Sequence, residues 1–317
     1  MNKLYAIGEL LIDFQSVGTG SLKQTERFMK KAGGAPANVC AQAVRLGPDA
    51  CYLTKVGDDG FGDFLIQALK DVGIETKYIQ KDPNANTSLA FVSFQENGER
   101  EFSFYRTKTA DLSFQSQDFA GVTFAKDDLL EFGSVALQSE ENRAVHRELI
   151  AKAKQSGAII AFDPNLRLNL WKDHEELRSI VKEFAELADI MKIGKDEAEW
   201  VYEKKGEDLL SFLQKGPWKI LLLTDGSKGA TLYANAHSYH CPGYRVKAID
   251  TTGAGDSFFG AFLGMLLREG LKKEGLLDFQ GYQKLLNFAC KAGAYTTTQY
   301  GAIQIMGNLE TIERTVQ

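Results

Sequence analysis

The sequence predicts a doubly wound α/β fold, in which helices flank a mostly parallel sheet and a small β-sheet forms a lid. Short apolar runs alternate with helical patterns along most of the chain, as in the βα units of a parallel sheet. Two hairpin patterns in the first third of the chain interrupt this alternation and predict the separate sheet. No repeat, low-complexity tract or flexible linker divides residues 1–317, so we expect a single domain.

The first third of the chain supplies a strand, two hairpins and two βα patterns. Pro36 and Gly47 mark the start and the end of the first helix. An Asn-Gly step at 97–98 is a strong hairpin signal, and we expect the lid to comprise residues of about 10–31 and 87–108. The predicted elements are a strand at 4–8, a hairpin from 10–17 and 23–30, a helix at 36–46, a strand at 50–56, a helix at 63–72, and a hairpin from 89–94 and 101–106.

The βα alternation resumes at residue 129 and continues to the C-terminal helices. A polar run that ends at Ile249 has the pattern of a further strand. The predicted strands are 129–137, 158–162, 190–193, 220–224 and 230–233, and the predicted helices are 140–155, 175–187, 196–202, 258–267 and 282–298.

The charge balance favours small-molecule partners. A net charge of -5 and a pI near 5.6, without a basic block, argue against nucleic acid and against a membrane surface. The N-terminus has no signal-peptide core, and no apolar run is long enough to span a bilayer, so we expect a cytoplasmic protein. The four cysteines lack CxxC spacing, which is typical of reduced thiols.

The stretch 250–256, DTTGAGD, predicts a helix N-terminus that binds an anion. Gly253 and Gly255 flank Ala254, so several N–H groups can face one point while the helix dipole adds positive potential. Asp256 in the first helical turn is placed to accept the proton of a hydroxyl that attacks phosphorus. A carboxylate near a helix N-terminus should also have a low pKa. The alternative is that Asp256 only caps the helix and the glycines only turn the chain.

Three other polar residues are candidates for binding a sugar. Asp13 follows the first strand, at a sheet end where a side chain can meet a ligand, although it could simply cap a turn. Asn38 lies one turn into a helix with a glycine-rich entrance, where its amide can bind a polyol or serve the fold alone. Arg106 ends a lid strand and is either a ligand contact or a solvated charge.

Several nucleotide and metal motifs are absent from the sequence. It has no Walker A loop and none of the protein-kinase motifs, and the glycines at 253 and 255 lack the third glycine of a dinucleotide fingerprint. His237 and His240 have metal-like spacing, but no carboxylate or cysteine lies at a matching distance. We therefore expect no metal site at these two histidines.

With these residues collected, the sequence resembles the ribokinase-like (PfkB) carbohydrate kinases, most of all the fructokinases. The resemblance runs from about residue 5 to 303, nearly the whole chain. Its motifs, in the order of the family, are GELLID at 8–13, GGAPANV at 33–39, GDDGFG at 57–62, FSFYR at 102–106 with AD at 110–111, DPNLR at 163–167, and DTTGAGDSF at 250–258.

The resemblance implies ATP-dependent phosphorylation of a primary hydroxyl of a sugar, with Mg²⁺ and a monovalent cation such as K⁺. It implies Asp256 as the base and the amides of Gly253, Ala254 and Gly255 as the anion hole. The other implied positions are Asp13, Gly34, Asn38, Arg106 and Arg167 for the sugar; Asn165, Glu197, Thr224, Gly226 and Gly229 for ATP; and Asp250, Thr252, Thr296 and Gly301 for the monovalent cation.

Two residues depart from the family pattern. Gly194 stands where relatives often have Asn or Ser, so a side-chain contact to Mg²⁺-bound water is lost there. Asp225 brings a negative charge to the turn that lines the nucleotide site, where an apolar residue is common. Neither change removes the base.

The motifs favour D-fructose as the substrate. 2-Keto-3-deoxygluconate is the alternative, because Arg167 could supply a second cation for an acid sugar; ribose and nucleosides fit less well, and a sugar-binding regulator without catalysis is a further alternative. The apolar stripes of the lid hairpins, which include Phe91, Phe102 and Phe104, predict packing against the substrate or a second lid, and hence a homodimer.

Overall fold

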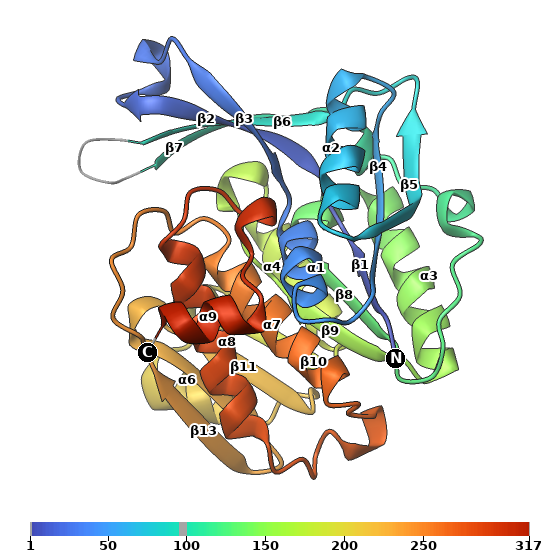
Figure 1. The fold of residues 1–317 in the computed structure, drawn as a ribbon. Helices are drawn as coiled ribbons and strands as arrows, with labels where there is room; N and C mark the ends of the chain where they lie inside the picture. The colour runs from blue at the N-terminus through green and yellow to red at the C-terminus, as the bar shows by residue number, and fades with distance from the viewer. Residues whose placement is uncertain (1, 95–99, 317) are drawn as a thin grey trace.

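A nine-stranded sheet forms the centre of the protein, with helices on both faces (Figure 1). The computed structural model describes residues 2–94 and 100–316. In spatial order the strands are β13 (His237–Pro242), β12 (Gly229–Ala234), β11 (Ile220–Thr224), β10 (Ile190–Gly194), β9 (Ile159–Asp163), β8 (Leu129–Gly133), β1 (Leu4–Ile7), β4 (Ala50–Gly57) and β5 (Glu75–Asp82). β12 pairs antiparallel with β11 and β13, and the remaining pairs are parallel. The predicted fold class is confirmed.

Two hydrophobic cores lie on opposite faces of this sheet. In β1, Leu4 and Ala6 belong to one core, whereas Tyr5 and Ile7 belong to the other. Strands buried on both faces read as continuous apolar runs, which is why the sequence reveals them so clearly. Helices α1 (Ala35–Val44), α2 (Gly60–Asp71), α7 (Ala254–Arg268), α8 (Tyr282–Thr297) and α9 (Leu309–Thr315) contribute to the first core; α3 (Glu140–Ser156), α4 (His174–Ala185), α5 (Lys195–Tyr202) and α6 (Gly206–Leu213) contribute to the second.

A four-stranded sheet stands beside the main sheet, at the top of Figure 1. Its order is β3 (Phe28–Gly33), β2 (Leu11–Thr19), β6 (Ser88–Phe94) and β7 (Arg100–Tyr105). β2 pairs antiparallel with β3 and parallel with β6, and β6 pairs antiparallel with β7. Two hairpins therefore join edge to edge, and the rings of Phe14 and Phe91 stack 4.9 Å apart across the junction. The predicted Asn-Gly turn at 97–98 lies outside the described residues.

Helices α1 and α7 pack unusually close together. A Cβ atom at Gly260 would lie 2.4 Å from the Val39 carbonyl oxygen, and one at Gly264 would lie 3.0 Å from Ala43 Cα. No side chain larger than hydrogen fits at these contacts without a shift of the backbone. The close packing brings the first turns of the two helices together, although they are more than two hundred residues apart in the chain.

Some predicted elements are wrong in detail. Residues 22–24 form a 3-10 turn, so the return strand starts at 28, and 135–138 is a 3-10 turn rather than the end of a strand. The run that ends at Ile249 is no strand; the Ile249 amide donates instead to the Thr297 carbonyl oxygen at the end of α8, at 2.7 Å. β5, α6 and α9 were not predicted.

None of the helices in the described residues is both long and apolar enough to cross a bilayer. All four cysteines are buried free thiols.

Candidate active site

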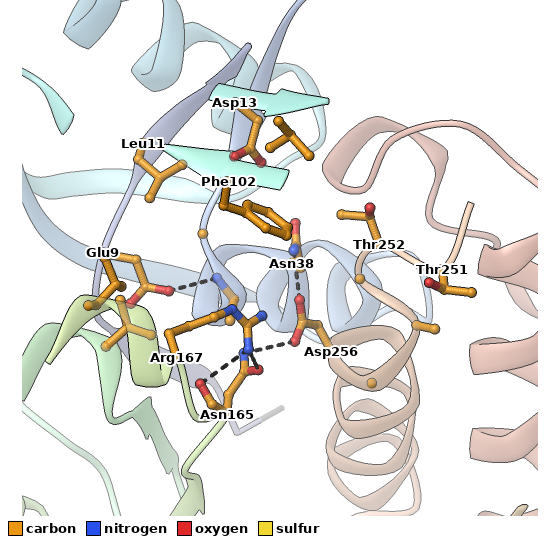
Figure 2. A pocket seen from close by; sticks show the side chains of 18 of the residues that line it. Glu9, Leu11, Asp13, Asn38, Phe102, Asn165, Arg167, Thr251, Thr252 and Asp256 are labelled. Carbon is orange, nitrogen blue, oxygen red and sulfur yellow. Dashed lines mark hydrogen bonds between the residues drawn. The ribbon is translucent and has the colours of Figure 1, made fainter. Parts of the chain in front are cut away.

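A cavity of about 450 Å³ lies between the small sheet and the N-terminal ends of α1 and α7 (Figure 2). The small sheet contributes apolar side chains of β6 and β7, and the main domain contributes the loops after β9 and before α7. The predicted residues on the cavity wall are Asp13, Gly34, Asn38, Asn165, Arg167, Thr252, Gly253, Ala254, Gly255 and Asp256. Residues from widely separated motifs are thus brought to one place.

The N-terminus of α7 has the conformation that an anion site needs. Gly253 is the N-cap residue with φ 72°, a left-handed conformation that costs little only for glycine. The main chain then enters α7 at Ala254, and the amides of the first turn have no partners within the helix. The residues of this turn line the cavity together with the positive end of the helix dipole, and the Ala254 amide makes only a long hydrogen bond, 3.4 Å, to the Thr251 carbonyl oxygen.

Asp256 stands in the first turn of α7 and is only 8% exposed. The Asn38 side-chain amide donates to its Oδ2 at 2.7 Å, and the Asn165 amide lies 3.4 Å from its Oδ1. Asn165 has φ 44° and accepts at its own Oδ1 from Arg167 Nη1 at 2.7 Å. Figure 2 shows these side chains converging on the carboxylate from α1 and from the loop after β9. The carboxylate is therefore held in a fixed orientation at the cavity wall.

The predicted low pKa of Asp256 is wrong. Burial raises the pKa of Asp256 above its usual range, although the hydrogen bond from Asn38 and the charges of Lys192 and Arg167 oppose the rise. The helix N-terminus was visible in the sequence, but the desolvation of the carboxylate by two flanking elements was not. A raised pKa makes Asp256 a stronger base than an exposed aspartate, which suits proton abstraction.

The opposite side of the cavity is built by β2 and β7. Asp13 projects from β2, and Phe102 and Phe104 of β7 add apolar surface. Glu9, which sequence reasoning missed, also lines the cavity: it is 3% exposed, and its Oε1 accepts from the Ala35 amide at 3.0 Å. Burial raises the pKa of Glu9. A wall that combines carboxylates with aromatic rings suits a polyhydroxylated ligand.

Arg106 lies beside the cavity but not on its wall, so the predicted sugar contact receives no support from the geometry. Its side chain is 1% exposed, and its Nε is 2.7 Å from Asp111 Oδ2. Its Nη1 donates to the Val135 carbonyl oxygen and to the side chain of Gln138. These contacts tie the end of β7 to the loop after β8, which gives Arg106 a structural part.

The residues predicted for ATP other than Asn165 are not on the wall of this cavity. Thr224 ends β11, and Gly226 and Gly229 form the turn that follows. Glu197 receives hydrogen bonds from the amides of Gly194 (2.9 Å) and Leu166 (2.6 Å), and so joins the ends of β9 and β10.

The charge of Asp225 is compensated within this region. Lys195 Nζ and Lys228 Nζ lie 3.7 Å and 3.4 Å from its Oδ2. The predicted negative charge on the nucleotide path is therefore partly neutralised by the protein itself.

The predicted cation residues surround the turn that leads into α7. Asp250 is 3% exposed; its Oδ1 accepts from the Thr252 amide and hydroxyl, and its Oδ2 accepts from the Gly301 amide at 3.3 Å. Thr296 donates to the Ala292 carbonyl oxygen within α8. Asp250 thus connects the turn of the anion site to the loop after α8.

Lys192 is a second cavity residue that the sequence analysis missed. It occupies the middle of β10, is 6% exposed, and its Nζ lies 2.8 Å from Asp163 Oδ2. A lysine inside an apolar strand was the available signal, because a buried charge is rare unless it has a partner.

Comparisons with known proteins identify the family of the chain. A family model described as pfkB family carbohydrate kinase matches residues 1–308, which confirms the resemblance drawn from the motifs. Probable fructokinase-5 of Arabidopsis thaliana is 40% identical over 304 residues, which covers 95% of this chain and 93% of that protein.

Two solved structures are similar over the full length. A fructokinase double mutant from Vibrio cholerae, bound to fructose, ADP and potassium ion, has a TM-score of 0.88 at 29% identity and covers 100% of this chain and 99% of its own. Fructokinase from Xylella fastidiosa with bound ATP also has a TM-score of 0.88, at 30% identity, with 99% and 97% covered.

Proposed function

The chain belongs to the pfkB family of carbohydrate kinases, and from this premise we propose that it transfers the γ-phosphoryl group of ATP to the primary hydroxyl of D-fructose, giving fructose 6-phosphate. The observation that carries the proposal is the buried Asp256 carboxylate beside the main-chain amides of the α7 N-terminus, in one cavity. The fructokinase names of its relatives support the sugar.

The reaction follows from this arrangement. The sugar oxygen forms a bond to the γ-phosphorus while the bond from phosphorus to the bridging oxygen of ADP breaks, and the electron pair of that bond leaves with ADP. The hydroxyl proton passes to Asp256. The amides of Gly253, Ala254 and Gly255 stabilise the charge on the phosphoryl oxygens, and they need no reorganisation because the helix already fixes them.

Asp13, Gly34 and Asn38 bind the sugar in this proposal. Asn38 also orients the base, since its amide donates to Asp256 Oδ2 at 2.7 Å. The aromatic rings of Phe102 and Phe104 cover the sugar and exclude water that would otherwise compete for the phosphoryl group. The small sheet therefore acts as a lid.

We infer that ATP lies along the ends of β9, β10 and β11, where Asn165, Glu197, Thr224, Gly226 and Gly229 meet it. Described residues contain no cluster of three or more side chains able to hold a metal ion. In this proposal Glu197, whose carboxylate lies where β9 and β10 end, would contact through water a Mg²⁺ ion carried by the ATP phosphates. Bound Mg²⁺ would neutralise phosphate charge during transfer.

A monovalent cation is proposed at the loop that Asp250 holds. The buried carboxylate fits a cation there, because it lies between the turn at 251–253 and the loop at 296–301, whose main-chain carbonyl groups are suitable ligands. An ion at this place would stabilise the turn that presents the anion-binding amides. Its test is turnover and thermal stability in KCl against tetramethylammonium chloride.

We propose a homodimer in which the small sheets pack together. This proposal rests on two large apolar side chains on one face of that sheet: Met29 is 52% exposed and Phe102 is 41% exposed, and the pairing of Met29 with Gln15, of Gln15 with Val92 and of Val92 with Phe102 places them on the same side. Such a face is unusual on a monomer. Sedimentation that finds only monomer at micromolar concentration, with sugar present, would contradict this proposal.

The experiment that tests the function is a substrate panel. ADP release is measured with fructose, 2-keto-3-deoxygluconate, ribose and adenosine at equal concentrations. Fructose is expected to give the highest kcat/KM. A preference for 2-keto-3-deoxygluconate would favour the alternative, in which Arg167 on the cavity wall supplies a cation for the acid group. Sugar binding without any ADP release would indicate a regulator instead of an enzyme.

A further inference from the structure

Lys192 holds a charge at a place where the fold alone would favour an apolar residue. Its neighbours in β10, Met191 and Ile193, are fully buried in the second core, and Lys192 points to the other face of the sheet. Removing an ammonium group from water costs several kcal/mol unless partners compensate. Asp163, at the end of the adjacent strand β9, is such a partner, but it is itself a buried carboxyl group. The pair therefore needs a reason beyond its own stability.

The position of the ammonium group supplies that reason. Nζ of Lys192 lies 3.2 Å from the point where a Cβ atom on Gly255 would stand, so it is adjacent to the first turn of α7. Lys192, Gly255 and Asp256 all line the same cavity. An ammonium group has three donors, and one of them is directed at Asp163.

The charges around the cavity also favour a contact between Lys192 and a phosphate group. Burial alone would lower the pKa of Lys192, but the carboxylates of Asp163 and Glu197 more than offset it and raise the pKa, so the ammonium keeps its proton. A triphosphate that enters beside Asp256 and Asp163 meets two carboxylates at close range. Without a cation on the protein, their repulsion would oppose the approach of the phosphoryl group.

We propose that Lys192 is a catalytic residue whose ammonium group binds an oxygen of the γ-phosphoryl group as it moves from ATP to the sugar. This inference rests on the proposed function as a sugar kinase and adds a residue to it. The phosphoryl group then lies between the α7 amides and Nζ. Asp163 is a positioning residue, because it holds the ammonium group without touching the substrate.

The test compares Lys192→Met with a matched control. Lys55 is also a buried strand lysine paired with aspartates: its Nζ is 3.0 Å from Asp118 Oδ2 and 3.7 Å from Asp82 Oδ2. Its side chain is 8% exposed against 7% for Lys192, and it lies outside the cavity wall. Both variants are expected to lose thermal stability. Only Lys192→Met should lose kcat, by roughly 10²-fold to 10³-fold, as when one preorganised donor is removed.

A binding measurement distinguishes a contact between Lys192 and phosphate from a purely structural role of Lys192. Calorimetry gives the affinities of wild type and variants for ADP and for the non-hydrolysable ATP analogue AMP-PNP, which differ by the γ-phosphate. Lys192→Met should weaken AMP-PNP at least tenfold more than ADP, whereas Lys55→Met should weaken neither. Lys192→Gln retains a donor toward Asp163 without the charge. If Lys192→Met does not fold, Lys192→Gln takes its place in both measurements, and it is expected to show the same losses of kcat and of AMP-PNP affinity.

The outcomes are distinct. Turnover of Lys192→Gln within threefold of wild type, or equal losses for ADP and AMP-PNP, would overturn the inference. If the wild type turns over none of the sugars, the proposed function fails, and the two nucleotide affinities still decide the Lys192 contact.

Discussion

Replacing Asp256 with Asn removes the base while it keeps the shape of the side chain. The carbonyl oxygen of the introduced amide can still accept the Asn38 amide at the 2.7 Å position. Its new NH₂ group would face the Asn165 amide, which cannot turn its oxygen inward because that oxygen already accepts from Arg167. One weak hydrogen bond is lost, so the stability should change by only about 1 kcal/mol.

The catalytic loss should be much larger than the structural one. The proton of the attacking hydroxyl has no other acceptor in the proposed mechanism, and a lost general base typically costs roughly 10²-fold to 10⁴-fold in rate. At about 1.36 kcal/mol for each factor of ten, the barrier should rise by about 3 to 5 kcal/mol. The KM for ATP should change little, because in the proposed mechanism Asp256 contacts the sugar hydroxyl rather than the nucleotide.

The assay is steady-state ADP release with saturating fructose, together with thermal unfolding of each variant. Asp63→Asn is the matched control: Asp63 also stands in the first turn of a helix, but it pairs with Lys81 away from the cavity wall. The control should keep the kcat of the wild type. Near-normal turnover of Asp256→Asn in a folded protein would refute Asp256 as the base.

Three further predictions concern other parts of the structure. Gly253→Ala places a Cβ atom on a residue with φ 72°, at 3.2 Å from Ala302 Cβ. The strain of about 1 to 2 kcal/mol should shift the main-chain amides at the start of α7 and lower kcat about tenfold. An unchanged kcat would argue against a role of these amides in binding the phosphoryl group. Arg106→Met leaves the buried Asp111 with hydrogen bonds from Ser88 and Thr109 but without its cation, and should lower the free energy of unfolding by about 3 kcal/mol with the sugar KM nearly unchanged. A large rise in sugar KM with normal stability would instead make Arg106 a sugar ligand. His146 is fully buried, which lowers its pKa from 6.5 to about 4, so the neutral form contributes stability above about pH 6.5 that is lost as the pH falls toward 4. His146→Gln should remove about 3 kcal/mol of the pH dependence of unfolding across that range, measured with denaturant at several pH values, and an unaltered slope would contradict the buried neutral imidazole.

The sequence predicted the central sheet well because its strands are buried on both faces. Strands such as β9 and β11 appear as uninterrupted apolar runs, and the helices between them have clear caps, as at Asp173 before α4. β5 escaped prediction because it lies at the edge of the sheet and is largely polar. The run before Asp250 looked like a strand, but the amides at its end bond to the end of α8, a tertiary contact that no local pattern encodes.

The candidate site was predictable where its chemistry lies in compact motifs. Asp256 with its glycines, Asn38 and Asp13 belong to such motifs, and the structure brings them to one cavity. Lys192 was missed because its role depends on Asp163 in the next strand and on α7, which belongs to a distant part of the chain. The pKa of Asp256 was misjudged for the same reason, since burial is a property of the assembled fold.

The close packing of α1 and α7 limits which substitutions the two helices can accept. Because Gly260 and Gly264 set how near the helices can come, they also set the separation of Asn38 from Asp256. A methyl group added at residue 260 would meet the Val39 carbonyl oxygen and force the helices apart, at a place outside the cavity wall. Overpacking of this kind typically costs about 1 to 3 kcal/mol, so such a variant should lose stability together with turnover, and mutational tolerance here is narrower than distance from the cavity suggests.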